Sequence, residues 1–113
     1  MPLRGEIVLV PVPFTDLSSN RRRPVIVISN NEYQKTTQDM IVVAMTSNPA
    51  NVPYSFVIDS TDLEQGALNR PGKVRVDKIY TLSQRLVVAT FGKVKEDILD
   101  RIRKDLDELT KKT

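Results

Sequence analysis

The chain has 113 residues, a length typical of one domain, and contains neither cysteine nor histidine. The lack of cysteine excludes disulfides, thiolate nucleophiles and cysteine-ligated metals. The lack of histidine removes the side chain most often used for acid–base catalysis near neutral pH. The net charge of +3 lies entirely in residues 1–94, because residues 95–113 hold six basic and six acidic side chains. A mildly basic body favours an anionic partner, although many basic proteins have none.

No part of the sequence is typical of a secretory signal or a membrane span. The apolar stretch near the N-terminus, residues 6–14, is interrupted by Pro11 and Pro13. A membrane span needs about 20 consecutive apolar residues. We therefore expect a cytoplasmic protein with no membrane contact, formed by a single domain over residues 1–113.

The first half of the chain predicts three strands joined by polar loops. Residues 6–10 are rich in β-branched side chains and predict a strand, and the polar residues 14–22 predict a loop. Residues 23–29 form an apolar run that indicates a strand buried on both faces. Residues 30–37 are polar and predict a second loop, and residues 40–45 predict another buried strand.

The second half predicts shorter, half-buried strands and then one helix. Residues 54–58 alternate between apolar and polar faces, and residues 61–66 have the spacing of a capped single helical turn. Residues 73–79 and 86–91 predict two more strands, the second closed by Gly92. Residues 95–111 carry an apolar stripe at helical spacing, which predicts a helix packed on the sheet. Strands followed by one helix indicate a mainly β fold, a small bent sheet or barrel with a C-terminal α-helix.

Three consecutive arginines, Arg21, Arg22 and Arg23, stand at the start of the buried strand at 23–29. Because side chains alternate along a strand, neighbouring arginines point to opposite sides and cannot all serve one purpose. A guanidinium fits a phosphate bidentately, and Ser19 and Asn20 offer further hydrogen-bond donors nearby. The alternative is a solvated loop whose arginine stems lie along apolar surface.

Two hydroxyl side chains, Thr46 and Ser47, directly follow the buried strand at 40–45. A hydroxyl at the end of a core strand is held more rigidly than one on a loop, and it can donate to a phosphate or a sugar oxygen. The alternative is simple, because Thr-Ser-Asn-Pro is also an ordinary turn sequence.

Further basic residues, Lys73, Arg75 and Lys78, lie on the predicted strand at 73–79, and Arg70 precedes it. Such a strand face can track a nucleic-acid backbone, or it can simply be solvated. Asp77 lies among these cations and is placed to pair with an arginine.

The carboxylates of the segment DSTDLEQG, residues 59–66, suggest a metal site only superficially. Their spacing differs from a calcium loop, and helix capping accounts for Thr61 and Glu64. We therefore expect no metal and no cofactor.

The stretch GEIVLVPVPFTDLSSNRRRPVIVISN, residues 5–30, resembles the MazF/PemK-like toxins of bacterial toxin–antitoxin systems. The shared pattern is a Gly-acidic-Ile-Val strand, a polar loop, Arg-Pro entering an apolar strand, and Thr at the end of the next one. The segments GKVRVDKIYTLSQRL (72–86) and FGKV (91–94) and the terminal helix also fit, so the resemblance spans nearly the whole chain. The PVPFTDLSS form of the first loop is similar to the PemK-like branch.

The resemblance implies an SH3-like small barrel of the MazF/PemK/CcdB type, a homodimer, and a cognate antitoxin partner. It also implies metal-independent, sequence-specific cleavage of single-stranded RNA such as mRNA, with the family's functional arginine at Arg23 and its threonine at Thr46. The glutamate that some members carry in the first loop has no counterpart here. We assign the remaining candidates to RNA binding: Ser19, Asn20, Arg21, Arg22, Ser47, Arg75 and Lys78.

The expected reaction is attack by the ribose 2′-hydroxyl on its own phosphate, which gives 2′,3′-cyclic phosphate and 5′-hydroxyl ends. Two alternatives remain open. One is a non-catalytic toxin of the same fold that inhibits DNA gyrase, as CcdB-like proteins do. Those proteins rely on a C-terminal tip bearing tryptophan, whereas this chain ends in LTKKT and has no tryptophan. The other is an RNA-binding module without catalysis.

Overall fold

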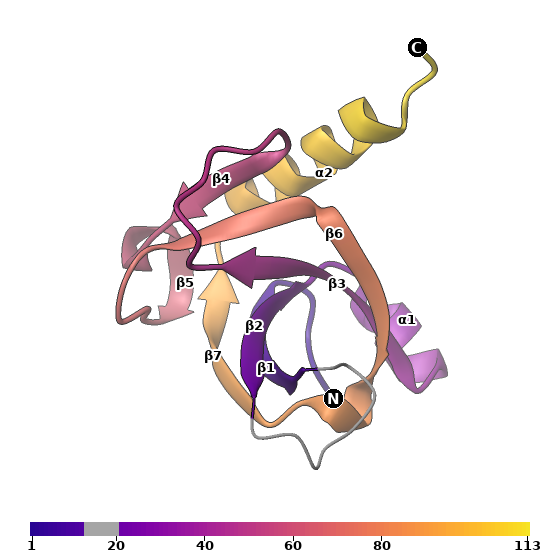
Figure 1. Cartoon of the computed structure of the whole chain (residues 1–113). Coiled ribbons are helices and arrows are strands. Elements are labelled where there is room, and N and C mark those ends of the chain that lie inside the picture. Colours follow the sequence, from indigo (N-terminus) through magenta and orange to yellow (C-terminus); the bar gives the residue numbers. More distant parts are fainter. Residues whose placement is uncertain (13–20) are drawn as a thin grey trace.

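A curled antiparallel sheet with a helix at one end forms the molecule in a computed structural model that describes residues 1–12 and 21–113 (Figure 1). The strands are β1 (Glu6–Pro11), β2 (Arg22–Val27), β3 (Asp39–Thr46), β4 (Ser55–Ile58), β5 (Leu63–Gly66), β6 (Gly72–Ser83) and β7 (Ala89–Val94). The helices are α1 (Asn31–Thr36) and α2 (Glu96–Thr110), with 3₁₀ turns at Ser60–Asp62 and Gln84–Leu86. Within the described ranges the strand order is β4-β6-β3-β2-β1-β7-β5.

The central strands β1, β2 and β3 are buried on both faces of the sheet. Because alternate side chains point to opposite faces, Ile7 and Ile26 join one apolar cluster while Val8 and Val25 join another. All four side chains are fully buried. The prediction that the unbroken apolar runs form doubly buried strands is therefore confirmed for β2 and β3.

A bend in the middle of β6 curls the sheet (Figure 1). The pairing of β3 with β6 passes from Val43 opposite Ile79 directly to Ala44 opposite Arg75, so residues 76–78 bulge out of the ladder. A bulge of this kind kinks the strand and increases its twist. Beyond the bend β6 continues to Ser83, further than the predicted end of this strand. The expected fold class, a mainly β, strongly bent sheet with a C-terminal helix, is confirmed.

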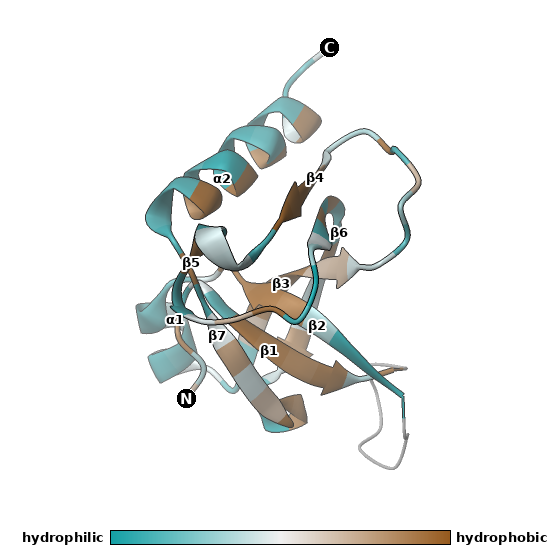
Figure 2. Cartoon of the chain, turned by 90° about the vertical axis from the view of Figure 1, so that its left-hand side faces the viewer, coloured by the Kyte–Doolittle hydropathy of each residue, from teal (hydrophilic) through white to brown (hydrophobic). Residues whose placement is uncertain are grey.

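Helix α2 packs its first turns on the sheet. Ile98, Leu99 and Ile102 are buried in the same apolar cluster as Ile7, which confirms the predicted sheet-facing stripe. The far end of α2 projects beyond the strands (Figure 2), and Leu109 there is 36% exposed. The helix ends at Thr110, one residue before its predicted end. Neither helix of the described ranges is long and apolar enough to cross a bilayer.

The prediction of a loop at residues 30–37 is wrong, because Asn31–Thr36 forms helix α1. The Asn30 side chain caps this helix by accepting a hydrogen bond from the backbone N–H of Tyr33 at 2.8 Å. Such a short, mostly polar helix has too few apolar residues to show helical periodicity, so its sequence resembles that of a polar loop.

Two predicted boundaries in the second half also need correction. The capped turn begins at Asp59, whose side chain accepts from Thr61 N–H while the Asp62 side chain accepts from Asp59 N–H, and the residues after it form β5 instead of a helical turn. The last strand is Ala89–Val94 and contains Gly92, which was expected to end it. Gly92 pairs with Gly66 in the ladder between β5 and β7, and the strands approach so closely there that a Cβ on Gly92 would come within 2.2 Å of the Gln65 carbonyl oxygen.

Candidate functional site

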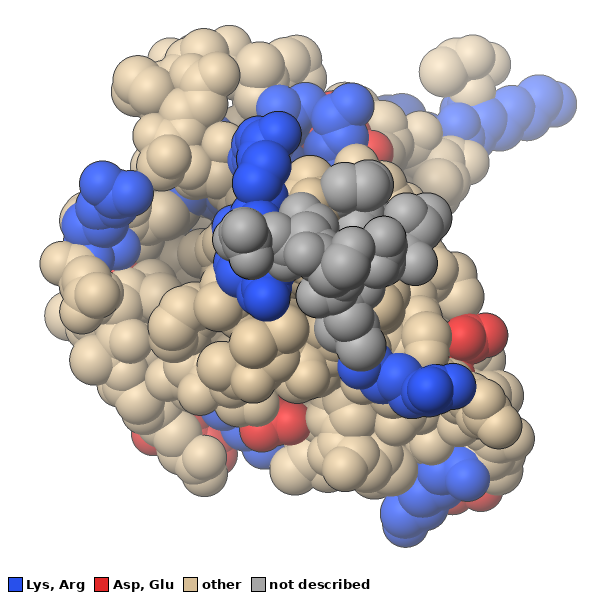
Figure 3. Space-filling model, turned by 60° about the horizontal axis from the view of Figure 1, so that its bottom comes forward, with Lys and Arg blue, Asp and Glu red and all other residues tan. Residues whose placement is uncertain are grey.

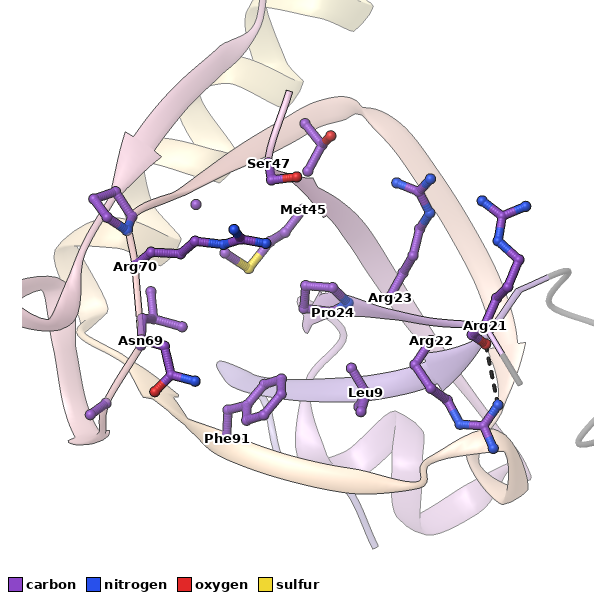
Figure 4. A pocket seen from close by; sticks show the side chains of 15 residues that line it. Leu9, Arg21, Arg22, Arg23, Pro24, Met45, Ser47, Asn69, Arg70 and Phe91 are labelled. Atoms are coloured by element: carbon purple, nitrogen blue, oxygen red, sulfur yellow. Dashed lines mark hydrogen bonds between the residues drawn. The ribbon is translucent and has the colours of Figure 1, made fainter. Parts of the chain in front are cut away.

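A pocket of about 550 Å³ opens where β2 begins and β3 ends (Figure 4). Its apolar lining residues are Leu9, Pro24, Met45, Ala67, Leu68, Pro71 and Phe91, and its basic ones are Arg21, Arg22, Arg23 and Arg70. Among the described residues that line it, none is acidic. Figure 3 shows basic side chains on both sides of a hollow on this face of the molecule. The pocket therefore combines an apolar surface with a positively charged rim, which suits an anionic ligand that also has an apolar part.

Arg23 and Thr46 both line this pocket. Strands β2 and β3 pair antiparallel, with Val25 opposite Ala44, and the same register continued by two residues sets Arg23 opposite Thr46. The antiparallel pairing that would bring these two residues to one end of the sheet is thus present. The Arg23 side chain is exposed, and among the described residues it has no ion-pair partner.

The hydroxyl of Thr46 is held by the turn that follows it. Thr46 Oγ1 accepts a hydrogen bond from the backbone N–H of Asn48 at 3.1 Å, and Asn48 Oδ1 accepts from Ala50 N–H at 3.0 Å. No acceptor among the described residues takes the hydroxyl proton of Thr46, so this proton can be donated to a ligand. These two side-chain-to-backbone hydrogen bonds close small side-chain turns over residues 46–50, and the first of them orients the hydroxyl.

Lys73 is a buried cation beneath the same turn. It lies opposite Thr46 in the β3–β6 pairing and is only 7% exposed. Its ammonium group donates to the carbonyl oxygens of Pro49, at 3.2 Å, and of Ala50. A buried charge is costly unless it is hydrogen-bonded, so these bonds fix the turn against β6. Lys73 therefore contributes to the support of the turn, and the alternative of a solvated strand face does not hold at this position.

The other two basic candidates on β6 lie outside the pocket. The Arg75 guanidinium donates to both carboxylate oxygens of Asp77, from Nε at 2.9 Å and from Nη2 at 2.8 Å, which confirms the predicted pairing. The hydrogen bond from Arg75 lowers the pKa of the Asp77 carboxyl below its usual value. Lys78 is exposed in the bulge of β6 and does not line the pocket.

The arginine cluster divides as strand alternation predicts. In Figure 4 the Arg21 and Arg23 side chains extend in one direction and Arg22 in the other. The Nη1 atom of Arg22 donates to the backbone oxygen of Arg21 at 3.2 Å. All three arginines line the pocket, as does the exposed Ser47. The remaining candidates, Ser19 and Asn20, lie outside the described residues.

The far wall of the pocket was not predicted from the sequence. It is formed by residues 67–72, which include Asn69 and Arg70, together with Phe91. Two glycines, Gly66 and Gly92, allow these segments to approach closely, because a Cβ on Gly66 would come within 2.2 Å of the Phe91 carbonyl oxygen and one on Gly92 within 2.2 Å of the Gln65 carbonyl oxygen. The available signal was the dipeptide Arg70–Pro71 just before a strand, which repeats the pattern of Arg23 and the proline after it.

The chain matches the family model of PemK-like, MazF-like toxins of type II toxin–antitoxin systems over residues 3–110. No curated protein has significant sequence similarity to it.

Several solved structures share the fold. A MazE–MazF complex from Deinococcus radiodurans has a TM-score of 0.77 and 25% identity, over 96% of this chain and 94% of that one. A mycobacterial endoribonuclease in complex with its cognate antitoxin has a TM-score of 0.71 and 23% identity, over 96% and 93% of the two chains. The Mycobacterium tuberculosis toxin MazF-mt6 has a TM-score of 0.72 and 14% identity, over 91% and 93%. Because the family model covers nearly the whole sequence, the chain belongs to the PemK-like, MazF-like toxins of type II toxin–antitoxin systems.

Proposed function

We propose that this protein is a toxin endoribonuclease that cleaves single-stranded RNA at specific sequences, with Arg23 and Thr46 as its catalytic residues. The observation that carries the proposal is the convergence of these two side chains at a pocket whose described lining residues include four arginines and no carboxylate. A phosphodiester is the anion that such a rim suits, since a guanidinium can bind two of its oxygens at once. Membership of a toxin family whose solved relatives include an endoribonuclease supports the same conclusion.

In the proposed reaction the ribose 2′-hydroxyl attacks the adjacent phosphorus, and the bond to the 5′-oxygen of the next nucleotide breaks. The RNA thus supplies its own nucleophile, and the protein needs neither a serine nor a cysteine for attack. The products are a 2′,3′-cyclic phosphate and a 5′-hydroxyl end. DNA lacks the 2′-hydroxyl and is not cleaved.

The roles of the two residues follow from their chemistry. As negative charge grows on the phosphoryl oxygens, the guanidinium of Arg23 stabilises it. Arginine stays protonated in proteins, so we assign it an electrostatic role and not proton transfer. Thr46, held by its turn, donates to a phosphate oxygen or orients the 2′-hydroxyl. Water takes up the proton that the 2′-hydroxyl loses and supplies the proton that the departing 5′-oxygen gains, so these steps need no metal, and we expect cleavage to be independent of metal.

The remaining candidates are proposed to bind the RNA strand around this centre. Arg21, Arg22 and Ser47 line the same pocket and are placed to hold neighbouring phosphates. Arg75 is a weaker candidate, because Asp77 already neutralises its charge. We also propose a cytoplasmic homodimer, as the family resemblance implies, and a cognate antitoxin that neutralises it, as the mycobacterial relative has.

Incubation of the purified protein with total RNA in excess EDTA, followed by sequencing of the new 5′ ends, tests the activity and its specificity together. We expect fragments with 5′-hydroxyl ends at a short shared sequence, and no cleavage of DNA of the same sequence. RNA that stays intact with or without added metal would reject the ribonuclease, and cleavage that stops only with EDTA would reject the metal-free mechanism. A supercoiling assay with purified gyrase tests the alternative target.

A further inference from the structure

Arg70 is an exposed arginine on the far wall of the pocket, and the proposed reaction does not use it. Within residues 1–12 and 21–113 no carboxylate forms an ion pair with it. In Figure 4 its side chain extends from that wall into the pocket, toward the end of β3. Arg23, on the other side, is exposed as well. Two guanidinium groups without carboxylate partners at one pocket attract an anion placed between them more strongly than one does.

The segment that carries Arg70 is held at both ends. The Leu68 N–H donates to Ser60 Oγ at 2.8 Å, and the Ser60 hydroxyl donates to the Leu68 carbonyl oxygen at 3.1 Å. Leu68 also packs against the apolar cluster beneath α2. At the other end Gly72 already belongs to β6 and pairs with β4. Pro71 has a fixed φ and restricts Arg70 to extended backbone, so the backbone of Arg70 is positioned before any ligand binds.

Thr46 lies between the two strands that carry these arginines. The register of β2 with β3 sets Arg23 opposite Thr46 on one side. On the other side Lys73 of β6 pairs with Thr46, and Arg70 stands three residues before Lys73. Adjacent strands are only about 4.8 Å apart. A phosphate bound to the Thr46 hydroxyl therefore has a guanidinium within reach from each neighbouring strand.

The proposed reaction creates a need for a second positive charge. A phosphodiester carries one negative charge. When the 2′-hydroxyl has lost its proton to water and has bonded to phosphorus, the five-coordinate phosphoryl group carries two, until the bond to the 5′-oxygen breaks and water protonates that oxygen. Only interactions that strengthen as this charge develops accelerate the step. One guanidinium balances the charge of the bound RNA, and a second one balances the charge that appears during the reaction.

We propose that Arg70 is a further catalytic residue, whose guanidinium contacts the same phosphoryl group as Arg23 from the opposite wall of the pocket. The inference rests on the proposed function and adds a third side chain to the two assigned there. Thr46 aligns the phosphoryl group, and the two arginines share its oxygens. If Arg70 instead held a neighbouring phosphate of the strand, its removal would raise KM and leave kcat unchanged.

Steady-state kinetics on a mapped RNA site test this role. Arg70→Ala should lower kcat by about 10²-fold and change KM by less than about threefold, and Arg70→Lys should recover part of kcat. The matched control is Arg85→Ala, which removes the same charge from an exposed arginine outside the pocket and should leave both constants within about threefold. Wild-type kcat in a folded Arg70→Ala protein would overturn the proposal, as would an equal loss of kcat in Arg85→Ala.

A nuclear magnetic resonance titration with ribose 5-phosphate tests the shared phosphate without any need for cleavage. At neutral pH this monoester carries close to two negative charges, as the reacting phosphoryl group does, and it has no base. The side-chain Nε–H signals of Arg23 and Arg70 should shift together with one Kd. Arg23→Ala and Arg70→Ala should each weaken binding about tenfold, and Arg85→Ala should not. A shift of the Arg23 signal alone, or unchanged affinity in Arg70→Ala, would overturn the shared site.

Failure of this inference can be distinguished from failure of the proposed function. Joint shifts of the two arginine signals in a protein that leaves RNA intact would support the shared phosphate site and reject the ribonuclease. Conversely, RNA cleavage at the same kcat by wild-type and Arg70→Ala proteins would support the ribonuclease and overturn the catalytic role of Arg70.

Discussion

Arg23 and Arg75 illustrate two ways in which one residue type is used in this sheet. Arg23, at the start of β2, is exposed at the pocket and has no ion-pair partner among the described residues. Arg75, in the middle of β6, makes two hydrogen bonds to Asp77 two residues along its own strand. A positive charge that is already paired attracts an added anion weakly, whereas an unpaired one at a pocket attracts it strongly. The number of arginines in a sequence therefore says less about anion binding than the carboxylates beside each one.

The largest expected effect is the loss of cleavage on removal of either catalytic side chain. Arg23→Ala and Thr46→Ala should each lower kcat for a mapped RNA site by about 10²- to 10³-fold with the fold retained. The control Arg75→Ala should cost less than tenfold, because its charge is already paired. A folded Arg23→Ala protein with wild-type activity, or an Arg75→Ala protein as impaired as Arg23→Ala, would contradict the distinction between the two arginines.

Lys73 provides a third situation, a cation that is buried and bonded to carbonyls. Lys73→Met keeps the side-chain volume but releases the turn after Thr46, so we expect kcat to fall about tenfold to 100-fold with little change in KM. The melting temperature should fall only modestly, because Pro49 and Ala50 are exposed and water can bind their carbonyls. Partial recovery of kcat in Lys73→Arg, which restores a donor, would identify positioning of Thr46 as the cause. Unchanged kcat in Lys73→Met would show that the hydrogen bonds within the turn are sufficient to position Thr46 without Lys73.

A smaller effect is expected in the salt dependence of RNA affinity, which also distinguishes an arginine at the pocket from the paired Arg75. Each phosphate contact on a single strand contributes about 0.7 to the slope of log affinity against log salt concentration. Arg21→Ala should reduce this slope by about that amount in a binding titration with a single-stranded 2′-deoxy oligonucleotide of the cleaved sequence, which binds but cannot be cleaved. The same measurement on Arg75→Ala should give the wild-type slope. Equal reductions in both variants would mean that Arg75 exchanges Asp77 for a phosphate when RNA binds.

The smallest expected effect is the acid sensitivity of the Arg75–Asp77 pair. Because the hydrogen bond from Arg75 lowers the pKa of Asp77 below 3.8, the pair stabilises the folded state above that pH and loses this contribution as the pH falls through the lowered value. Wild-type protein should melt at a slightly higher temperature than Asp77→Asn at neutral pH, and the difference should vanish in strong acid. Thermal melts of the two proteins across this pH range measure it. A difference that grows in acid would exclude the pair as its source.

Much of the fold was predictable because its signals are local. The apolar runs that form β2 and β3, and the helical stripe of α2, are patterns within a few consecutive residues, and burial enforces them. The juxtaposition of Arg23 with Thr46 was also within reach, because both lie at strand ends and neighbouring strands usually pair antiparallel. Short elements such as α1 and β5 were missed, since a few polar residues show no periodicity.

What the amino-acid sequence determines by itself here is the set of doubly buried strands and the terminal helix, whereas the choice of Arg23 and Thr46 rests on the family resemblance. Only the tertiary structure decides that Lys73 is buried beneath the Thr46 turn, that Arg75 is paired, and that Arg70 and Phe91 close the pocket. The physical reason is the range of the interactions. Periodicity is a property of neighbours along the chain, whereas burial of a charge and the shape of a pocket depend on segments that only folding brings together, as at Gly66 and Gly92.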